Sequence, residues 1–107
     1  MLDVVRSVSG TPIRLTDERW AHIAEGHCEL AGLRSALLRV VADPEEVLAG
    51  AAGERLAVRE VEAGKALVVV YREDGDDGFV ITAFLTRRMA SLARRRRLWP
   101  SPTSSST

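Results

Sequence analysis

The sequence predicts an α+β fold in which two or three N-terminal helices pack on an antiparallel sheet of three to four strands. Apolar residues recur every three or four positions in the first half of the chain, but every second position after residue 54. The strand-like segments of the second half are joined by links too short for a crossover, so neighbouring strands must be antiparallel. The length of 107 residues and the hydrophobic fraction of 46% suit one domain, which we expect over residues 1–93. A basic, Ser/Pro-rich tail, disordered by composition, is expected over 94–107.

The first sixteen residues predict one or two short extended segments, broken by a glycine and a proline. Thr16 is well placed as the N-cap of a helix over residues 17–25, because its hydroxyl can accept a hydrogen bond from a backbone N–H of the first turn. Acidic residues follow it directly, where the helix dipole favours them. Gly26 is typical of the residue that ends a helix, which would leave His27 just outside it.

A second helix is predicted over residues 29–42, where Leu and Val recur at helical spacing. The segment "DPEEVL" (43–48) indicates a further helical turn, with Asp43 as its N-cap and Pro44 in the first position.

Three strands are predicted from the period of two in the second half of the chain, over residues 55–62, 65–72 and 79–86. Ala63 and Gly64 supply a tight turn between the first two, and "DGDDG" (74–78) a longer one before the third. A last short helix is expected within "RRMASLARRRRLWP".

Charge is unevenly distributed along a chain of zero net charge. All fifteen acidic residues precede position 78, whereas residues 87–107 carry six arginines and no acid. An acidic body repels RNA unless arginines gather on its active face or the tail reaches over that face. The single cysteine, Cys28, and the absence of a leader-like or membrane-spanning apolar run favour a cytoplasmic protein without membrane contact.

Both histidines lie in "ERWAHIAEGHCEL" (18–30), five residues apart. On one continuous helix His22 and His27 would point about 140° apart, so they could not share a face. A helix that ends at Gly26 would free His27 to turn back toward His22, and the two could then act as base and acid in turn. Spacing alone favours two ordinary histidines. The residues around them match no known zinc pattern, and turn chemistry explains the aspartates of "DGDDG", so we expect no metal and no cofactor.

A hydroxyl and an arginine on the strands form a second candidate site. By strict alternation, Thr82 shares a strand face with Val80 and Phe84, opposite Ala83. If Arg59 met Thr82 on an open face of the sheet, the two would suit a phosphate. The alternative is a strand threonine and a solvated arginine paired with an acid.

Three segments in order resemble a phage-associated branch of the barnase–EndoU–colicin–RelE-like (BECR) nuclease superfamily. They are "WAHIAEGHCEL", then "DPEEVL", then a hairpin ending "VVVY…GFVITAF", and the resemblance covers about residues 13–86. It implies metal-independent RNA cleavage on an α+β, BECR-like fold whose sheet face receives the phosphodiester. Cys28 stands where that branch usually has a proline, and Phe84 where tyrosine is commoner.

The resemblance also implies residue roles. His22 and His27 match the two histidines, Thr82 matches the strand threonine, and Arg59 loosely matches a basic strand residue; these four are the expected catalytic residues. The expected substrate-binding residues are Glu29, Arg72, Arg87 and Arg88.

The function expected from this resemblance is a small endoribonuclease, toxin-like or phage-derived, that cleaves RNA by 2′-OH attack. The alternative is a catalytically inactive domain of the same fold that binds RNA or a protein partner of the antitoxin or immunity type.

Overall fold

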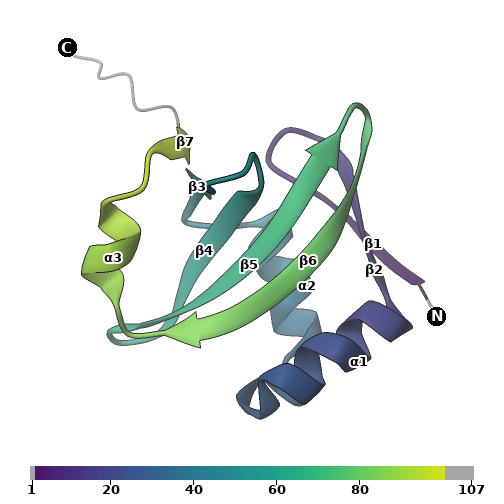
Figure 1. The fold of residues 1–107 in the computed structure, drawn as a ribbon, viewed down its shortest axis with the longest axis horizontal. Coiled ribbons are helices and arrows are strands. Elements are labelled where there is room, and N and C mark those ends of the chain that lie inside the picture. Colours follow the sequence, from purple (N-terminus) through teal and green to yellow (C-terminus); the bar gives the residue numbers. More distant parts are fainter. Residues whose placement is uncertain (1, 101–107) are drawn as a thin grey trace.

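A computed structural model describes residues 2–100 of the chain, and its centre is one mixed sheet (Figure 1). The strand order is β1-β2-β6-β5-β4-β3-β7. Strands are short at both edges and long in the middle: β1 (Leu2–Arg6), β2 (Pro12–Thr16), β3 (Glu46–Ala49), β4 (Arg55–Glu62), β5 (Lys65–Asp74), β6 (Asp77–Thr86) and β7 (Arg97–Trp99). Neighbours pair antiparallel except β2 and β6, which are parallel.

The helices are short and lie on both sides of this sheet: α1 (Asp17–Gly26), a 3₁₀ turn η1 (Cys28–Leu30), α2 (Arg34–Ala42) and α3 (Met89–Ala93). Figure 1 shows α2 behind the sheet and α3 at its front edge. No helix in residues 2–100 has the length and apolar character needed to cross a membrane.

The predicted fold, with two or three N-terminal helices on a sheet of three to four strands, is therefore wrong. The described residues form a seven-stranded mixed sheet with three short α-helices. The segment predicted as a third helical turn instead enters β3, where Val47 and Leu48 are buried against β4. Asp43 and Pro44 favour the start of a helix, but pairing with the longer strand β4 outweighs this local preference. The four residues of β3 are too few for their own sequence pattern to determine their secondary structure.

Two further boundaries differ from the prediction. The helix expected over 29–42 is divided into η1 and α2, with Gly32 between them at a φ of +83° that an L side chain rarely adopts. The first part of the predicted tail contributes β7, which pairs with β3. Residues 101–107, the rest of that tail, lie outside the described part of the chain.

The three predicted central strands are present as β4, β5 and β6, and the N-terminal segment forms two strands. The predicted cap of α1 is also present, since the Thr16 hydroxyl accepts a hydrogen bond from the Arg19 N–H at 3.0 Å. Gly26 is the last residue of α1 rather than the first beyond it.

The main core lies between the sheet and the α1–α2 side. Its largest fully buried side chains include Tyr71, Ile13, Leu15, Ile23 and Leu37. A smaller apolar layer on the opposite side of the sheet packs under α3 through Leu92. We call this opposite side the open face; its floor is formed by Leu56, Val68, Val70, Thr82 and Phe84.

A β-bulge decides which residues of β6 reach the open face. Val70 pairs with Thr82, but the next residue, Tyr71, pairs with Val80, so Ile81 is an extra residue in β6. Val80 is consequently buried in the main core, while Thr82 stays on the open face. The predicted grouping of Val80 with Thr82 is wrong because strict alternation does not hold across a bulge.

Candidate active site

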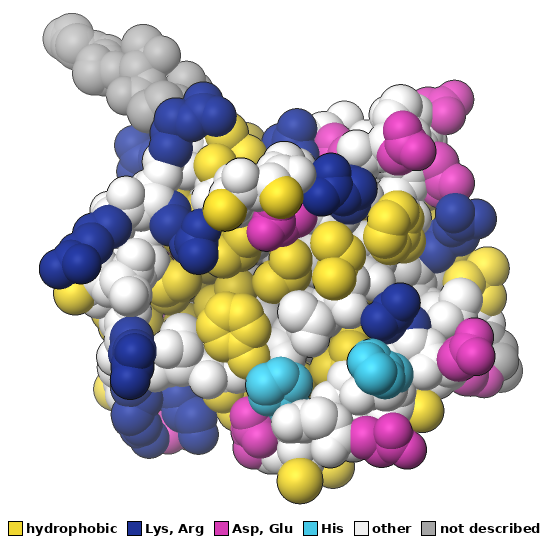
Figure 2. Space-filling view, viewed as in Figure 1, with side chains coloured by type: hydrophobic (Ala, Val, Ile, Leu, Met, Phe, Trp, Pro, Cys, Tyr) yellow, Lys and Arg dark blue, Asp and Glu magenta, His cyan; other side chains and the backbone are white. Residues whose placement is uncertain are grey.

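Both histidines lie at the rim of the open face. They are the two histidines of the chain, and Figure 2 shows both imidazoles on this side, next to the apolar floor. His22 is on α1, while His27 follows the helix with the non-helical angles φ −139° and ψ 79°. The change of backbone direction after Gly26 allows two residues five apart to reach one side of the molecule.

The two histidines have different surroundings. His22 lines an open cavity of about 490 Å³ together with Thr16, Glu18 and Arg19. The Nδ1 atom of His27 lies 3.5 Å from Oε2 of Glu29, and both side chains are partly exposed. A carboxylate beside an imidazole can orient the ring. The structure therefore brings His27 and Glu29 together, as a candidate site requires.

Arg19 was not among the predicted site residues. It precedes His22 by three positions on α1, and residues at i and i+3 share a helix face. This spacing was available in the sequence as a signal.

Thr82 and Phe84 alternate along β6 toward the open face, and both are half-buried. Because α2 packs on the main core and lies behind the sheet in Figure 1, the side seen in Figure 2, on which the two imidazoles appear, is the open face. Packing of α1 against β6 fixes the helix beside this strand.

Arg59 is placed on the other side of the sheet. It shares a face of β4 with Ala57, which is fully buried in the main core, and its Nη1 donates to the Asp43 carbonyl oxygen at 2.9 Å. The Asp43 carboxylate lies 3.7 Å from the same nitrogen. The structure thus does not bring Arg59 together with Thr82.

The other predicted binding arginines are dispersed. Arg72 belongs to the open side of β5, where its Nη2 donates to the Ala52 carbonyl at 2.9 Å. Arg87 pairs with Glu62 at 3.5 Å. Arg88 lies at the start of α3 and lines a groove on the open face.

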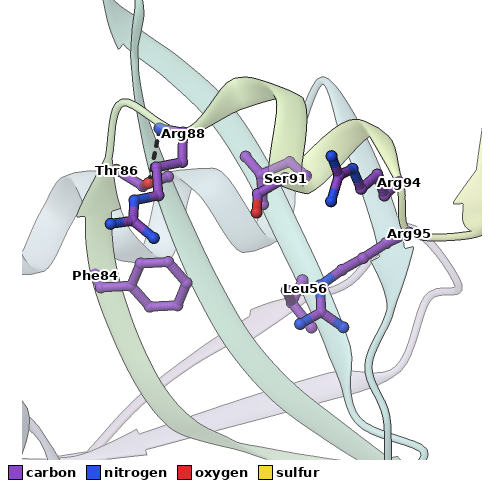
Figure 3. Close-up of a pocket in the computed structure, with 8 residues that line it drawn as sticks. Leu56, Phe84, Thr86, Arg88, Ser91, Arg94 and Arg95 are labelled. Atoms are coloured by element: carbon purple, nitrogen blue, oxygen red, sulfur yellow. Dashed lines mark hydrogen bonds between the residues drawn. The ribbon is translucent and has the colours of Figure 1, made fainter.

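This groove, of about 310 Å³, lies between α3 and the sheet (Figure 3). Its lining is basic at the top and apolar at the floor: Leu56, Phe84, Thr86, Arg88, Ser91, Leu92, Arg94 and Arg95. The sequence placed Arg94 and Arg95 in a loose tail, because nothing local indicates that β7 anchors the residues after them. The run of arginines was the only feature of the sequence that indicated a basic surface here.

Possible metal ligands are scattered in the described residues. No group of three or more His, Cys, Asp or Glu side chains within residues 2–100 is close enough to hold a metal ion. At the start of β6, Asp77 pairs with Arg14 at 2.8 Å.

A family model described as phage-Barnase-EndoU-ColicinE5/D-RelE like nuclease 2 matches residues 2–99. The match spans every strand from β1 to β7. The chain belongs to this family. Comparisons with curated proteins and with solved structures found no significant match.

Membership in the phage BECR nuclease family confirms the predicted resemblance and supports a nuclease fold. The matched span also includes β3 and β7, whose residues were predicted as a helical turn and as part of a disordered tail. These two short strands are therefore part of the family domain.

Proposed function

We propose that this protein is a metal-independent endoribonuclease, toxin-like or phage-derived, that cleaves RNA by attack of a ribose 2′-OH on the adjacent phosphate. One observation carries the proposal: His22 and His27 lie at the same rim of the open face whose floor contains Thr82. Two imidazoles beside an exposed sheet face supply a base and an acid on either side of a bound phosphodiester.

In the proposed reaction one imidazole takes the proton of the 2′-OH, and O2′ attacks phosphorus. The bond from phosphorus to O5′ then breaks, and the second imidazole gives its proton to O5′. The products are a 2′,3′-cyclic phosphate and a 5′-hydroxyl. One histidine has gained a proton and the other has lost one. We assign no order to the two histidines.

The phosphorane carries extra negative charge that hydrogen-bond donors must stabilise. Thr82 offers a hydroxyl on the open face, and Arg19 offers a guanidinium in the cavity that His22 lines. Arg19 takes the place first assigned to Arg59, whose guanidinium is engaged by Asp43 on the opposite side of the sheet.

The test is cleavage of total RNA in EDTA by the wild type and by the His22→Ala and His27→Ala variants. Each substitution should reduce the cleavage rate about 10²- to 10⁴-fold, the usual contribution of a general acid or base. Arg39→Ala is the matched control, because Arg39 is exposed on α2, away from the open face, and it should cleave as the wild type does.

Circular dichroism must first show that every variant is folded. Cleavage in EDTA that leaves 2′,3′-cyclic phosphate ends and spares 2′-O-methyl RNA is the expected result. An intact RNA after incubation with folded wild type, or cleavage at the wild-type rate by both histidine variants, would refute the proposal.

A second candidate is a catalytically inactive module that binds a protein partner of the antitoxin or immunity type. It is favoured by β1, an outer strand of the sheet on which Leu2 and Val4 are each 51% exposed. An outer strand with apolar side chains can pair with an extended segment of another protein. Such pairing should persist at high salt, and Val4→Lys should weaken it.

A further inference from the structure

The groove under α3 is the most basic concave surface of the open face. Arg88 precedes α3, Arg94 and Arg95 follow it, and Figure 3 shows Arg88 and Arg95 extending toward the floor made by Phe84 and Leu56. Figure 2 shows Lys and Arg side chains along this side of the apolar floor.

These guanidinium groups are not neutralised. Within residues 2–100, no Asp or Glu oxygen lies within 4.0 Å of Arg88, Arg94 or Arg95. The Glu54 carboxylate acts on Arg95 at longer range, since the pKa of Glu54 is lowered by its own backbone N–H, by that of Ala52 and, more weakly, by Arg72 and Arg95. Arg95 also donates from Nη1 to the Ala49 carbonyl oxygen at 3.4 Å. Three available guanidiniums around one groove indicate a polyanionic ligand, because each can form paired hydrogen bonds with a phosphate.

The floor adds a second kind of interaction. Phe84 is half-buried, and its ring borders the groove together with the hydroxyl-bearing residues Thr86 and Ser91. An aromatic ring beside arginines is the combination that binds an unpaired nucleobase and its phosphates. A duplex cannot use the ring, since its bases are stacked on each other and only its backbone faces outward.

We propose that this groove binds a single-stranded segment of the RNA, with phosphates on Arg88, Arg94 and Arg95 and one unpaired base stacked on Phe84. The substrate class of the enzyme is then unpaired RNA, such as loops and single strands, rather than duplex. This inference rests on the proposed ribonuclease function, because it names the RNA that the histidine site receives.

Binding is measured apart from cleavage with a fluorescein-labelled 2′-O-methyl RNA, which lacks the nucleophile. Fluorescence anisotropy over a salt series compares the single strand with its duplex for the wild type, Arg94→Ala/Arg95→Ala and Phe84→Leu. Arg39→Ala is again the matched control.

The wild type should bind the single strand at least tenfold more tightly than the duplex. The double arginine variant should bind about tenfold more weakly near 0.1 M salt. Its slope of log K against log salt should fall by about 1.4, because each of the two phosphates that an arginine no longer neutralises accounts for about 0.7. Phe84→Leu should weaken binding about 5- to 100-fold, since the base can no longer stack on a ring. Phe84→Tyr keeps the ring and should bind as the wild type, which separates stacking from any effect on folding.

Equal binding of strand and duplex, or wild-type affinity in both the arginine and the phenylalanine variants, would overturn the groove proposal even if the enzyme cleaves RNA. Binding as expected, combined with no cleavage of 2′-OH RNA, would leave the groove as an RNA site and refute the ribonuclease. The two failures are therefore distinguishable.

Discussion

Tyr71 is the largest fully buried side chain of the core, and its hydroxyl has no hydrogen-bond partner among the described residues. It lies on the helix side of β5, within the main core. Burial, reinforced by the nearby charge of Glu73 and opposed by Arg55, raises the pKa of Tyr71 to about 12. A phenol in this position stabilises the fold only while it is neutral.

The pKa of Tyr71 predicts an alkaline loss of stability. Because the folded pKa exceeds the unfolded value near 10, the unfolded state releases its proton first, and the free energy of unfolding falls between about pH 10 and 12. The loss should reach at most about 2–3 kcal/mol. Tyr71→Phe should remove this pH dependence and be no less stable at neutral pH, since no hydrogen bond is removed.

Urea unfolding at several pH values measures this effect. Tyr71 is the only tyrosine of the chain, so tyrosinate absorbance reports its ionisation alone. A folded chain whose tyrosine ionises near pH 10 would contradict the assignment.

At the scale of single elements, α1 carries the first histidine and positions the second. At its start the Thr16 hydroxyl accepts a hydrogen bond from the Arg19 N–H. At its end the His27 N–H donates to the Ile23 carbonyl at 3.0 Å. Apart from Ile23, its side chains are at least partly exposed, so the helix depends on these ends more than a deeply packed helix would.

Thr16→Ala should therefore lower the free energy of unfolding by about 1 kcal/mol, the usual cost of losing an N-cap. Thr16→Asp keeps an oxygen at the cap and should retain most of the stability. Chemical denaturation of the two variants and the wild type measures the difference. If alanine and aspartate destabilise equally, the cap bond does not stabilise α1.

Whether a segment is a helix or a strand could be predicted from the sequence where the segment is long enough to show a hydrophobic period. The strands β4, β5 and β6 each show alternation over eight residues or more, and they were predicted correctly. The strands β3 and β7 have four and three residues, and each becomes a strand only through its neighbour. The bulge at Ile81 is also invisible locally, because it is defined by the partner strand.

At the scale of the whole molecule, Arg34 joins three elements. From α2 its Nε donates to Asp3 of β1 at 2.7 Å, and its Nη1 lies 2.8 Å from Asp17 of α1. Burial would lower the pKa of Arg34, but the hydrogen bonds to the two carboxylates outweigh it and raise that pKa. The edge strand and both helices are thus tied together by one cation.

Arg34→Ala should cost about 1 kcal/mol of unfolding free energy, because Asp3 and the exposed Asp17 lose the cation that they share. Arg39→Ala, on the same helix but exposed, should change it by less than about 0.5 kcal/mol. Urea unfolding of both variants is the measurement. Equal stability of the two would show that the network contributes nothing beyond a surface charge.

Only the part of the candidate site that depends on local sequence could be predicted. His22, His27 and Thr82 follow from local motifs, and the structure places all three on or at the rim of the open face. The side taken by Arg59 depends on how β4 pairs with its neighbours, and the groove depends on β7 fixing the chain after α3. Both are properties of the assembled sheet, so no segment read alone contains them.

The parallel pairing of β2 with β6 joins an early segment of the chain to one of its last strands. His22 and His27 leave the ribosome long before Thr82, Phe84 and the arginines around α3. A nascent chain in which β6 has not yet been synthesised lacks the open face, even if its N-terminal helices have already formed. Translation itself thus withholds the proposed activity until β6 and the residues around α3 have been synthesised.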